Sequence, residues 1–145
     1  MKKFTTILAT AGLIGMFTGC VASSEPSIET ATKLDLNKVC SVKVSGIQSV
    51  INTAKEYNVI AQKEGLEYRR LGVNNSALIS SVEDAIKTGA KEVNPLDFKG
   101  KTSKTKLPTD FGAERACRFA ITALTQSVEG KETWRLSVPG DGYKY

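Results

Sequence analysis

The sequence contains no histidine among its 145 residues. Histidine is the commonest metal ligand in proteins and the commonest general acid or base near neutral pH. Its absence therefore removes the most frequent designs of hydrolytic and metal-dependent active sites. The adjacent acids Glu83 and Asp84 do not replace it, because neighbouring residues on a helix point in different directions. We expect no enzymatic activity, no cofactor and no metal site.

Two short motifs of phosphate and acyl-enzyme chemistry are incomplete. The run Gly100-Lys101-Thr102 matches the end of a phosphate-binding loop, but Pro95 stands where that loop needs its first glycine. Ser103 and Lys106 have the spacing of a serine–lysine nucleophile pair, which needs a desolvated lysine at a rigid helix start and not a lysine in a charged loop. A histidine-free hydrolase is therefore the least supported alternative.

The amino-terminal apolar run is shorter than the roughly 20 residues that a helix needs to span a bilayer. It extends without charge from Phe4 to Phe17 and follows Lys2 and Lys3. A positive start, an apolar stretch of about 7–15 residues and small residues before a cleavage point are typical of a secretory signal. We expect residues 1–19 to be a signal peptide that is removed.

The segment Phe17-Thr18-Gly19-Cys20 resembles the lipobox of bacterial lipoproteins, with phenylalanine where leucine is usual. The resemblance implies cleavage before Cys20 and attachment of acyl chains such as palmitate to that cysteine. Two or more chains anchor a protein stably without a membrane-spanning helix. Val21 in place of aspartate then implies the outer membrane, with the protein facing the periplasm. The alternative is an ordinary signal cut after Ala22, which releases a soluble periplasmic protein.

Cysteine is scarce, and its count is odd. Lipidation of Cys20 leaves Cys40 and Cys117 as an even pair in an oxidising compartment, where an unpaired thiol is a liability. Cys40 lies on the apolar face of an expected strand and Cys117 in the apolar stripe of an expected helix, so both point into one core. Because the chain has no Cys-x-x-Cys motif, we expect a structural disulfide and not a redox site.

Composition divides the chain into three parts. After the signal peptide, residues 20–37 comprise the lipidated cysteine and a segment rich in Ser, Thr and Glu, which we expect to be a flexible tether. Residues 38–145 have the size of a single globular domain. Without Lys2 and Lys3 the formal charge of +5 falls to +3, an excess too small to indicate nucleic acid as a partner.

Apolar periodicity predicts an α+β fold in which three helices pack against a small, mostly antiparallel sheet. Alternation predicts strands at residues 38–44 and 133–138, and residues 66–71 are either a strand or a continuation of the preceding helix. Recurrence every three or four residues, with Gly65 and Gly89 as stops, predicts helices over residues 47–65, 75–89 and 111–128.

Two features are candidate binding elements. A polar loop carries four lysines in eight residues, Lys99, Lys101, Lys104 and Lys106. It is either a solvated loop or a site for anionic lipid, glycan or an acidic partner. Phe119 lies on the opposite face of its helix from Cys117, so that either a sheet covers it or it is an exposed anchor for a partner.

These observations favour a non-enzymatic envelope lipoprotein whose domain binds another envelope component, as a scaffold, an assembly accessory or an exclusion or inhibitory factor. A binding module for anionic glycans or lipids through the lysine loop is the alternative. The two differ in salt dependence, because only binding by the lysine loop should weaken steeply as ionic strength rises.

Overall fold

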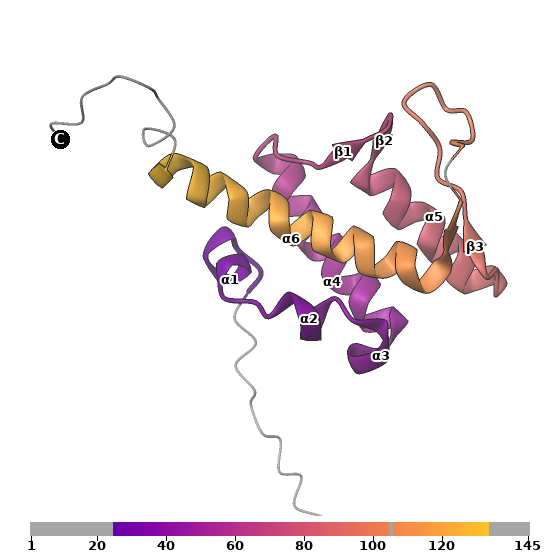
Figure 1. The fold of residues 1–145 in the computed structure, drawn as a ribbon, viewed down its shortest axis with the longest axis horizontal. Helices are drawn as coiled ribbons and strands as arrows, with labels where there is room; N and C mark the ends of the chain where they lie inside the picture. Colours follow the sequence, from indigo (N-terminus) through magenta and orange to yellow (C-terminus); the bar gives the residue numbers. More distant parts are fainter. Residues whose placement is uncertain (1–24, 105, 134–145) are drawn as a thin grey trace, which may run out of the picture.

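The computed structural model describes residues 25–104 and 106–133. This part of the chain is mostly helical, and three of its helices are long (Figure 1). The helices are α1 (Ile28–Thr32), α2 (Leu36–Val39), α3 (Val42–Ser45), α4 (Ile47–Lys63), α5 (Asn75–Thr88) and α6 (Thr109–Thr133). Strand β1 (Arg69–Arg70) pairs with β2 (Val73–Asn74), and β3 (Glu92–Val93) pairs with β4 (Leu107–Pro108), both antiparallel.

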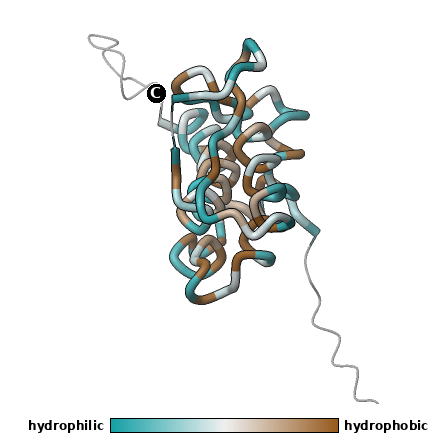
Figure 2. The backbone as a smooth tube through the Cα atoms, turned by 90° about the vertical axis from the view of Figure 1, so that its right-hand side faces the viewer, coloured by the Kyte–Doolittle hydropathy of each residue, from teal (hydrophilic) through white to brown (hydrophobic). Residues whose placement is uncertain are grey.

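The core lies between α4, α5 and α6. Each of these helices contributes an apolar stripe that is buried against the other two, as in Ile51, Val82 and Leu124. Figure 2 shows hydrophobic and hydrophilic stretches alternating along the helices, as expected when each helix buries only one face. In Figure 1, α6 runs lengthwise between the short helices α1–α3 on one side and the β1–β2 hairpin on the other.

Gly112 allows α6 to approach α5 and β3 closely. A Cβ atom added there would lie 2.9 Å from Val93 Cγ2 and 3.1 Å from Val82 Cγ2. Both distances are shorter than ordinary carbon contacts of about 3.5–4.0 Å. The small sheet β3–β4 therefore packs on α6 at a point where the helix has no side chain.

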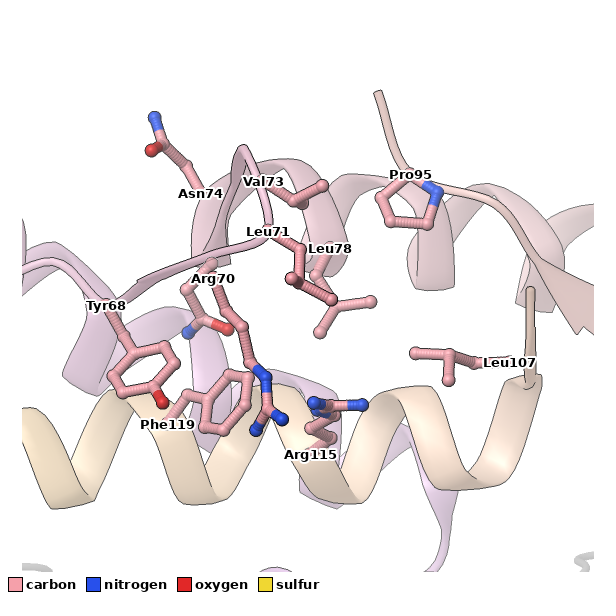
Figure 3. A pocket seen from close by; sticks show the side chains of 11 residues that line it. Tyr68, Arg70, Leu71, Val73, Asn74, Leu78, Pro95, Leu107, Arg115 and Phe119 are labelled. Carbon is pink, nitrogen blue, oxygen red and sulfur yellow. The ribbon is translucent and has the colours of Figure 1, made fainter. Parts of the chain in front are cut away.

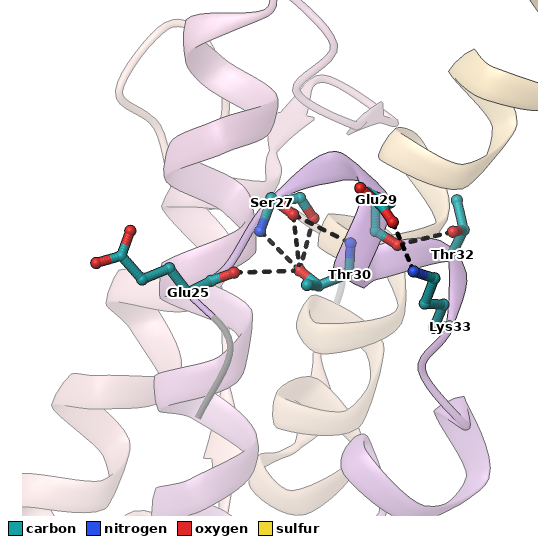
Figure 4. Close-up of polar contacts among 6 residues, drawn as sticks. All are labelled: Glu25, Ser27, Glu29, Thr30, Thr32 and Lys33. Atoms are coloured by element: carbon teal, nitrogen blue, oxygen red, sulfur yellow. Dashed lines mark hydrogen bonds and ion pairs between the residues drawn. The ribbon is translucent and has the colours of Figure 1, made fainter. Parts of the chain in front are cut away.

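The packed domain begins earlier in the chain than the sequence indicates. Ser27 caps α1 by accepting a hydrogen bond from the Thr30 backbone N–H at 3.1 Å, and the Thr30 side chain accepts one from the Ser27 N–H at 2.7 Å (Figure 4). This capping box satisfies two free donors of the helix start. Ala31 is buried against the core. The expectation that all of residues 20–37 form a flexible tether is therefore wrong for residues 27–37.

The strand expected at residues 38–44 is also wrong. This segment contains the end of α2, the disulfide cysteine Cys40 and most of α3. Glu114 of α6 holds the start of α3, because its Oε1 accepts a hydrogen bond from the Val42 backbone N–H at 2.8 Å. Val44, which alternation would place on the same strand face as Cys40, is exposed. The alternation of apolar residues here reflects two short helices with a bend between them.

The three expected long helices are confirmed, whereas the single sheet is not. Helix α6 extends to Thr133 and not to residue 128, so the strand expected at residues 133–138 does not begin there, and its other residues lie outside the described part of the chain. Of residues 66–71, only Arg69 and Arg70 form a strand. The described β structure consists of two separate two-stranded sheets and an isolated antiparallel bridge between Leu96 and Thr102.

The predicted disulfide between Cys40 and Cys117 is confirmed. The two Cα atoms lie 5.5 Å apart, and the bond joins residues 77 positions apart in the sequence. Both cysteines are fully buried. The bond attaches the turn between α2 and α3 to the middle of α6. Within the described residues, no helix has the length and apolar character required to cross a membrane.

Candidate functional site

A cavity of about 50 Å³ lies between the β1–β2 hairpin, the start of α5 and one face of α6 (Figure 3). A water-sized group needs about 10–15 Å³ of such space, so the cavity has room for about three to five non-hydrogen atoms. It is therefore a site for one small chemical group and not for a whole metabolite. Its walls are formed by Tyr68, Arg70, Leu71, Val73, Asn74, Asn75, Leu78, Pro95, Leu107, Arg115 and Phe119.

The hairpin turns through Leu71 and Gly72, which both have positive φ angles of 52° and 80°. Two-residue turns of this kind normally use Asn or Gly, because a side chain in the left-handed region costs about 1–2 kcal/mol. This chain nevertheless has a leucine at the first turn position, and Leu71 is 78% exposed. A strained and exposed apolar residue thus stands at the edge of the cavity.

Two arginines line the cavity without a counter-ion. Arg70 comes from β1 and Arg115 from α6, and neither takes part in an ion pair between described residues. Figure 3 shows both side chains among the walls of the cavity. Arg115 stands over that ring, with 5.1 Å from its Cζ atom to the ring centroid. Planar guanidinium groups bind carboxylates through paired hydrogen bonds, so two of them at one cavity favour an anion.

Two asparagines that line the cavity, Asn74 and Asn75, each have a buried side-chain oxygen with no hydrogen-bond partner among the described residues. Asn75, which is 2% exposed, donates from Nδ2 to the Asn58 Oδ1 atom at 2.9 Å and to the Ala116 carbonyl oxygen at 3.0 Å. Because the Ala116 carbonyl can only accept a hydrogen bond, the NH₂ group of Asn75 must face it, which determines the orientation of the Asn75 side-chain amide. The Asn75 Oδ1 atom is buried and has no partner among the described residues. Such atoms are rare in proteins because leaving them unpaired costs about 1–3 kcal/mol.

Glu67 supports this arrangement from the segment before β1. Its Oε1 atom accepts hydrogen bonds from the Ser76 backbone N–H at 2.8 Å and from Asn58 Nδ2 at 3.3 Å. Because the N-cap residue Asn74 makes no side-chain capping bond, the carboxylate of Glu67 caps α5 instead. Burial raises the pKa of Glu67, but hydrogen bonds from Ser76, Asn58 and Gln62 outweigh burial and hold the pKa below its ordinary value.

Phe119 is neither fully covered nor fully exposed. Its ring stacks on Tyr68, with 4.0 Å between the ring centroids and 24° between the ring planes. Tyr68 directly precedes β1. The segment that leads into the β1–β2 hairpin therefore covers part of the α6 face opposite Cys117. The rest of the Phe119 ring forms a wall of the cavity.

Both ends of the lysine loop lie near the cavity. Pro95, four residues before Lys99, and Leu107, next to Lys106, are among the residues that line the cavity. Asp97 organises the loop by accepting hydrogen bonds from the backbone N–H groups of Lys99 and Lys101 at 2.8 and 2.9 Å. The lysine side chains point outward, and none takes part in an ion pair between described residues. These exposed lysines are Lys99, Lys101, Lys104 and Lys106.

The structure thus brings Phe119 and the ends of the lysine loop to one place, while Cys20 lies outside the described residues. Sequence reasoning missed Arg70, Arg115 and Asn75. A signal for Asn75 exists, because it stands three and seven positions before Leu78 and Val82 in the buried stripe of α5. A polar residue in such a stripe needs buried partners.

Two wider depressions, of about 350 and 360 Å³, lie elsewhere on the surface. Neither is lined by a buried polar atom that lacks a partner. The described residues contain no group of three or more Cys, Asp or Glu side chains arranged to hold a metal ion. Comparison of the chain with protein families, curated proteins and solved structures finds no match.

Proposed function

We propose that this chain is a lipid-anchored bacterial envelope protein whose folded domain binds another envelope protein through the tip of the β1–β2 hairpin and the adjoining loop. The observation that carries the proposal is Leu71, a strained leucine held in solvent at that tip. Backbone strain of this kind gathers at functional sites, where a binding role offsets its cost. The function is that of a binding module and not of an enzyme.

The surroundings of Leu71 have the composition of a protein interface. Phe98 is 58% exposed, and its backbone N–H donates to the Gly72 carbonyl oxygen at 2.8 Å, which attaches the loop to the hairpin tip. The Arg69 guanidinium lies 6.0 Å from the centroid of the Phe98 ring. Aromatic residues and arginine are enriched at interfaces and dominate their binding energy. We refer to Arg69, Leu71 and Phe98 as the hairpin surface.

The partner should carry acidic groups around an apolar contact. Lys99 follows Phe98 directly, and Lys101 stands two residues further on. Asp97, the acid beside them, accepts hydrogen bonds from their backbone N–H groups. Complementary charges across an interface raise the association rate and select the partner. The alternative occupant is an anionic glycan or lipid bound by the lysines alone. Its binding would disappear at high salt, whereas an apolar contact would persist.

The binding proposal is tested by Leu71→Asn, with Val44→Asn on the distant helix α3 as the matched control. Both positions are exposed apolar residues, at 78% and 65%. The full-length protein is expressed in the bacterial envelope, cross-linked and purified in detergent. Leu71→Asn should abolish one cross-linked protein species that Val44→Asn retains, and it should not lower the thermal midpoint, because asparagine tolerates the left-handed region. Retention of every cross-linked species by Leu71→Asn would refute the proposal.

The anchor is tested by Cys20→Ser. Acyl labelling with radioactive palmitate and removal of the signal should both be lost, because the same cysteine receives the lipid and marks the cleavage point. Cys40→Ser is the control, and it should leave labelling per molecule of protein unchanged, although it breaks the Cys40–Cys117 bond and destabilises the domain. Normal processing together with membrane attachment of the Cys20→Ser protein would refute lipid anchoring.

A further inference from the structure

We infer that the cavity between the β1–β2 hairpin and α6 binds the carboxylate tip of an aspartate or glutamate side chain of the partner protein. The inference rests on the proposed function and names the group of the partner that enters the cavity. It is carried by two arginines with free donors, by the small volume of the cavity and by its apolar walls.

Arg115 presents N–H donors that no other described residue uses. Its Cζ atom lies 5.1 Å from the centroid of the Phe119 ring and 5.9 Å from that of the Phe111 ring. Such contacts involve the face of the guanidinium plane, whereas the N–H groups lie in that plane and stay free. Within the described part of the chain, the Arg115 side chain makes no hydrogen bond and no ion pair, although it is partly buried. A partly buried cation without an acceptor favours an anionic ligand.

Arg70 brings a second guanidinium group to the same cavity. Figure 3 shows its side chain extending from β1 toward α6, the helix that carries Arg115. Among residues 25–104 and 106–133, the Arg70 side chain has neither a hydrogen-bond acceptor nor an acidic partner. Two cations at one cavity repel each other unless an anion lies between them. A carboxylate offers two acceptor oxygens in one plane, which matches the donor geometry of a guanidinium group.

The volume of the cavity limits the ligand to the tip of a side chain. A space of about 50 Å³ holds about three to five non-hydrogen atoms. The carboxylate and the adjacent CH₂ group of aspartate or glutamate are four such atoms, and the rest of the residue stays outside. The carboxyl terminus of a protein exceeds the limit, because its carboxylate is attached directly to a branched Cα atom.

The walls of the cavity distinguish a carboxylate on a CH₂ group from a phosphate. Beside the arginines, the lining includes the aliphatic side chains of Val73, Leu78 and Leu107. A CH₂ group packs against such walls without loss of hydrogen bonds. A phosphate has oxygens on all sides and would place one of them against the aliphatic wall, where it has no hydrogen-bond donor and its desolvation is costly. The combination of charge, size and apolar contact therefore favours the acidic side chain.

The test is an NMR titration of the full-length protein in detergent micelles, in which the arginine Nε–H signals are followed at constant ionic strength. Acetate has the carboxylate and the small apolar part, and acetamide lacks the charge. The probe 2,2-dimethylpropanoate has a branched carbon next to its carboxylate, and inorganic phosphate lacks the apolar part. Acetate should shift the Arg70 and Arg115 signals. It should bind at least about tenfold more tightly than each other probe, as expected from loss of a charged hydrogen bond or from overpacking.

Three results of this titration would overturn the inference. Equal affinity of acetate and 2,2-dimethylpropanoate would show that carboxylates pair with the arginines at the surface and do not enter the cavity. Tighter binding of phosphate than of acetate would assign the site to another class of ligand. Acetate that shifts neither arginine signal would leave the cavity without a carboxylate site.

Arg115→Gln and Arg118→Gln form a matched pair, because they remove the same charge from one helix and only Arg115 lines the cavity. Arg115→Gln should weaken acetate binding about tenfold or more, as should Arg70→Gln, whereas Arg118→Gln should leave it unchanged. Arg115→Lys keeps the charge but removes the planar pair of donors, so it should weaken binding as well. An equal loss in Arg115→Gln and Arg118→Gln would show a general charge effect and refute the site.

Cross-linking in the bacterial envelope decides whether the carboxylate belongs to the partner protein. Arg115→Gln should lower the yield of the cross-linked species that Leu71→Asn abolishes, and Arg118→Gln should retain it. If acetate binds but Arg115→Gln retains the full yield, the occupant is not a side chain of this partner and the inference falls. If acetate fails to bind while Leu71→Asn still abolishes the species, the inference falls and the proposed function stands. If Leu71→Asn retains the species, the proposed function falls, and with it the assignment of the carboxylate to this partner.

Discussion

Removal of the Cys40–Cys117 bond should destabilise the domain strongly, and the size of the effect follows from the loop that the bond closes. The cysteines are 77 residues apart. In the chain-entropy model, a crosslink over a loop of this length restricts the unfolded chain by about 4–5 kcal/mol. The native cost of Cys→Ala is small by comparison, because each side chain loses only one sulfur atom from a packed site. We therefore expect a loss of about 4 kcal/mol in the free energy of unfolding.

The measurement is urea unfolding of the oxidised protein, followed by circular dichroism, for Cys40→Ala, Cys117→Ala and the double variant. If the free energy of unfolding falls by about 1.5 kcal/mol per molar urea, as in domains of this size, the urea concentration at the midpoint of unfolding should fall by roughly 3 M. Because either substitution breaks the same bond, the double variant should lose little more than either single variant. Reductant added to the wild-type protein should reproduce the effect.

Two results would refute this reasoning. A loss below about 1 kcal/mol in the single variants would show that the bond does not restrict the unfolded chain as the model requires. Losses that add in the double variant would show that each cysteine acts through its own packing and not through the bond.

Three further predictions concern Glu67, Gly112 and Phe119, with Gly130 as the control for Gly112. Glu67→Gln should lower the free energy of unfolding by about 1 kcal/mol at neutral pH, as for loss of a helix cap. Because the folded pKa of Glu67 lies below the ordinary value of 4.5, the stabilisation by its carboxylate is present above that pH and is lost as pH falls through the folded pKa. The free energy of unfolding should therefore depend less on acid pH in the variant, and an unchanged pH dependence would contradict the assignment. Gly112→Ala should destabilise by about 1–2 kcal/mol, because overpacking against Val93 and Val82 exceeds the gain in helix propensity. Gly130→Ala on the same helix meets no atom within 4 Å and should stabilise by up to about 1 kcal/mol, so equal effects at the two glycines in thermal unfolding would contradict the packing argument. Phe119→Ala should cost about 2 kcal/mol in urea unfolding, roughly half the value for a fully buried phenylalanine, and a cost of 4 kcal/mol or more would show that the ring belongs to the core.

The long helices could be predicted from the sequence because each has an apolar stripe of helical period and a stop signal. Gly89 ends α5 in the left-handed conformation, as its position after the stripe indicates. The segment containing α2 and α3 could not be predicted in this way. Helices of four residues do not form on their own, and α3 depends on the hydrogen bond from Val42 to Glu114, 72 residues away.

The candidate site could be predicted only in part. The helical phase of Phe119 indicates a side chain outside the main apolar stripe of α6, and Tyr68 stacks on its ring there. The polar loop expected over residues 99–109 is shorter, because Leu107 and Pro108 form β4 and Thr109 begins α6. Arg70 and Arg115 gave no local signal, because their common feature is a cavity formed by distant segments. The buried pair Asn58 and Asn75 could have been found, since both stand in phase with apolar stripes. Two asparagines in such positions indicate that each serves the other as a hydrogen-bond partner.

The position of α6 in the chain has a consequence for the order of folding. This helix is the last described element, yet it contacts α1, α3, α4 and α5 as well as β3 and β4. A chain that emerges with its amino terminus first therefore has α4 and α5 before it has the helix that covers their apolar faces. Contacts between distant segments form late and slow folding, and apolar surface exposed in the meantime promotes aggregation. The Cys40 thiol likewise has no native partner until Cys117 has been synthesised, so a disulfide that Cys40 forms earlier is non-native.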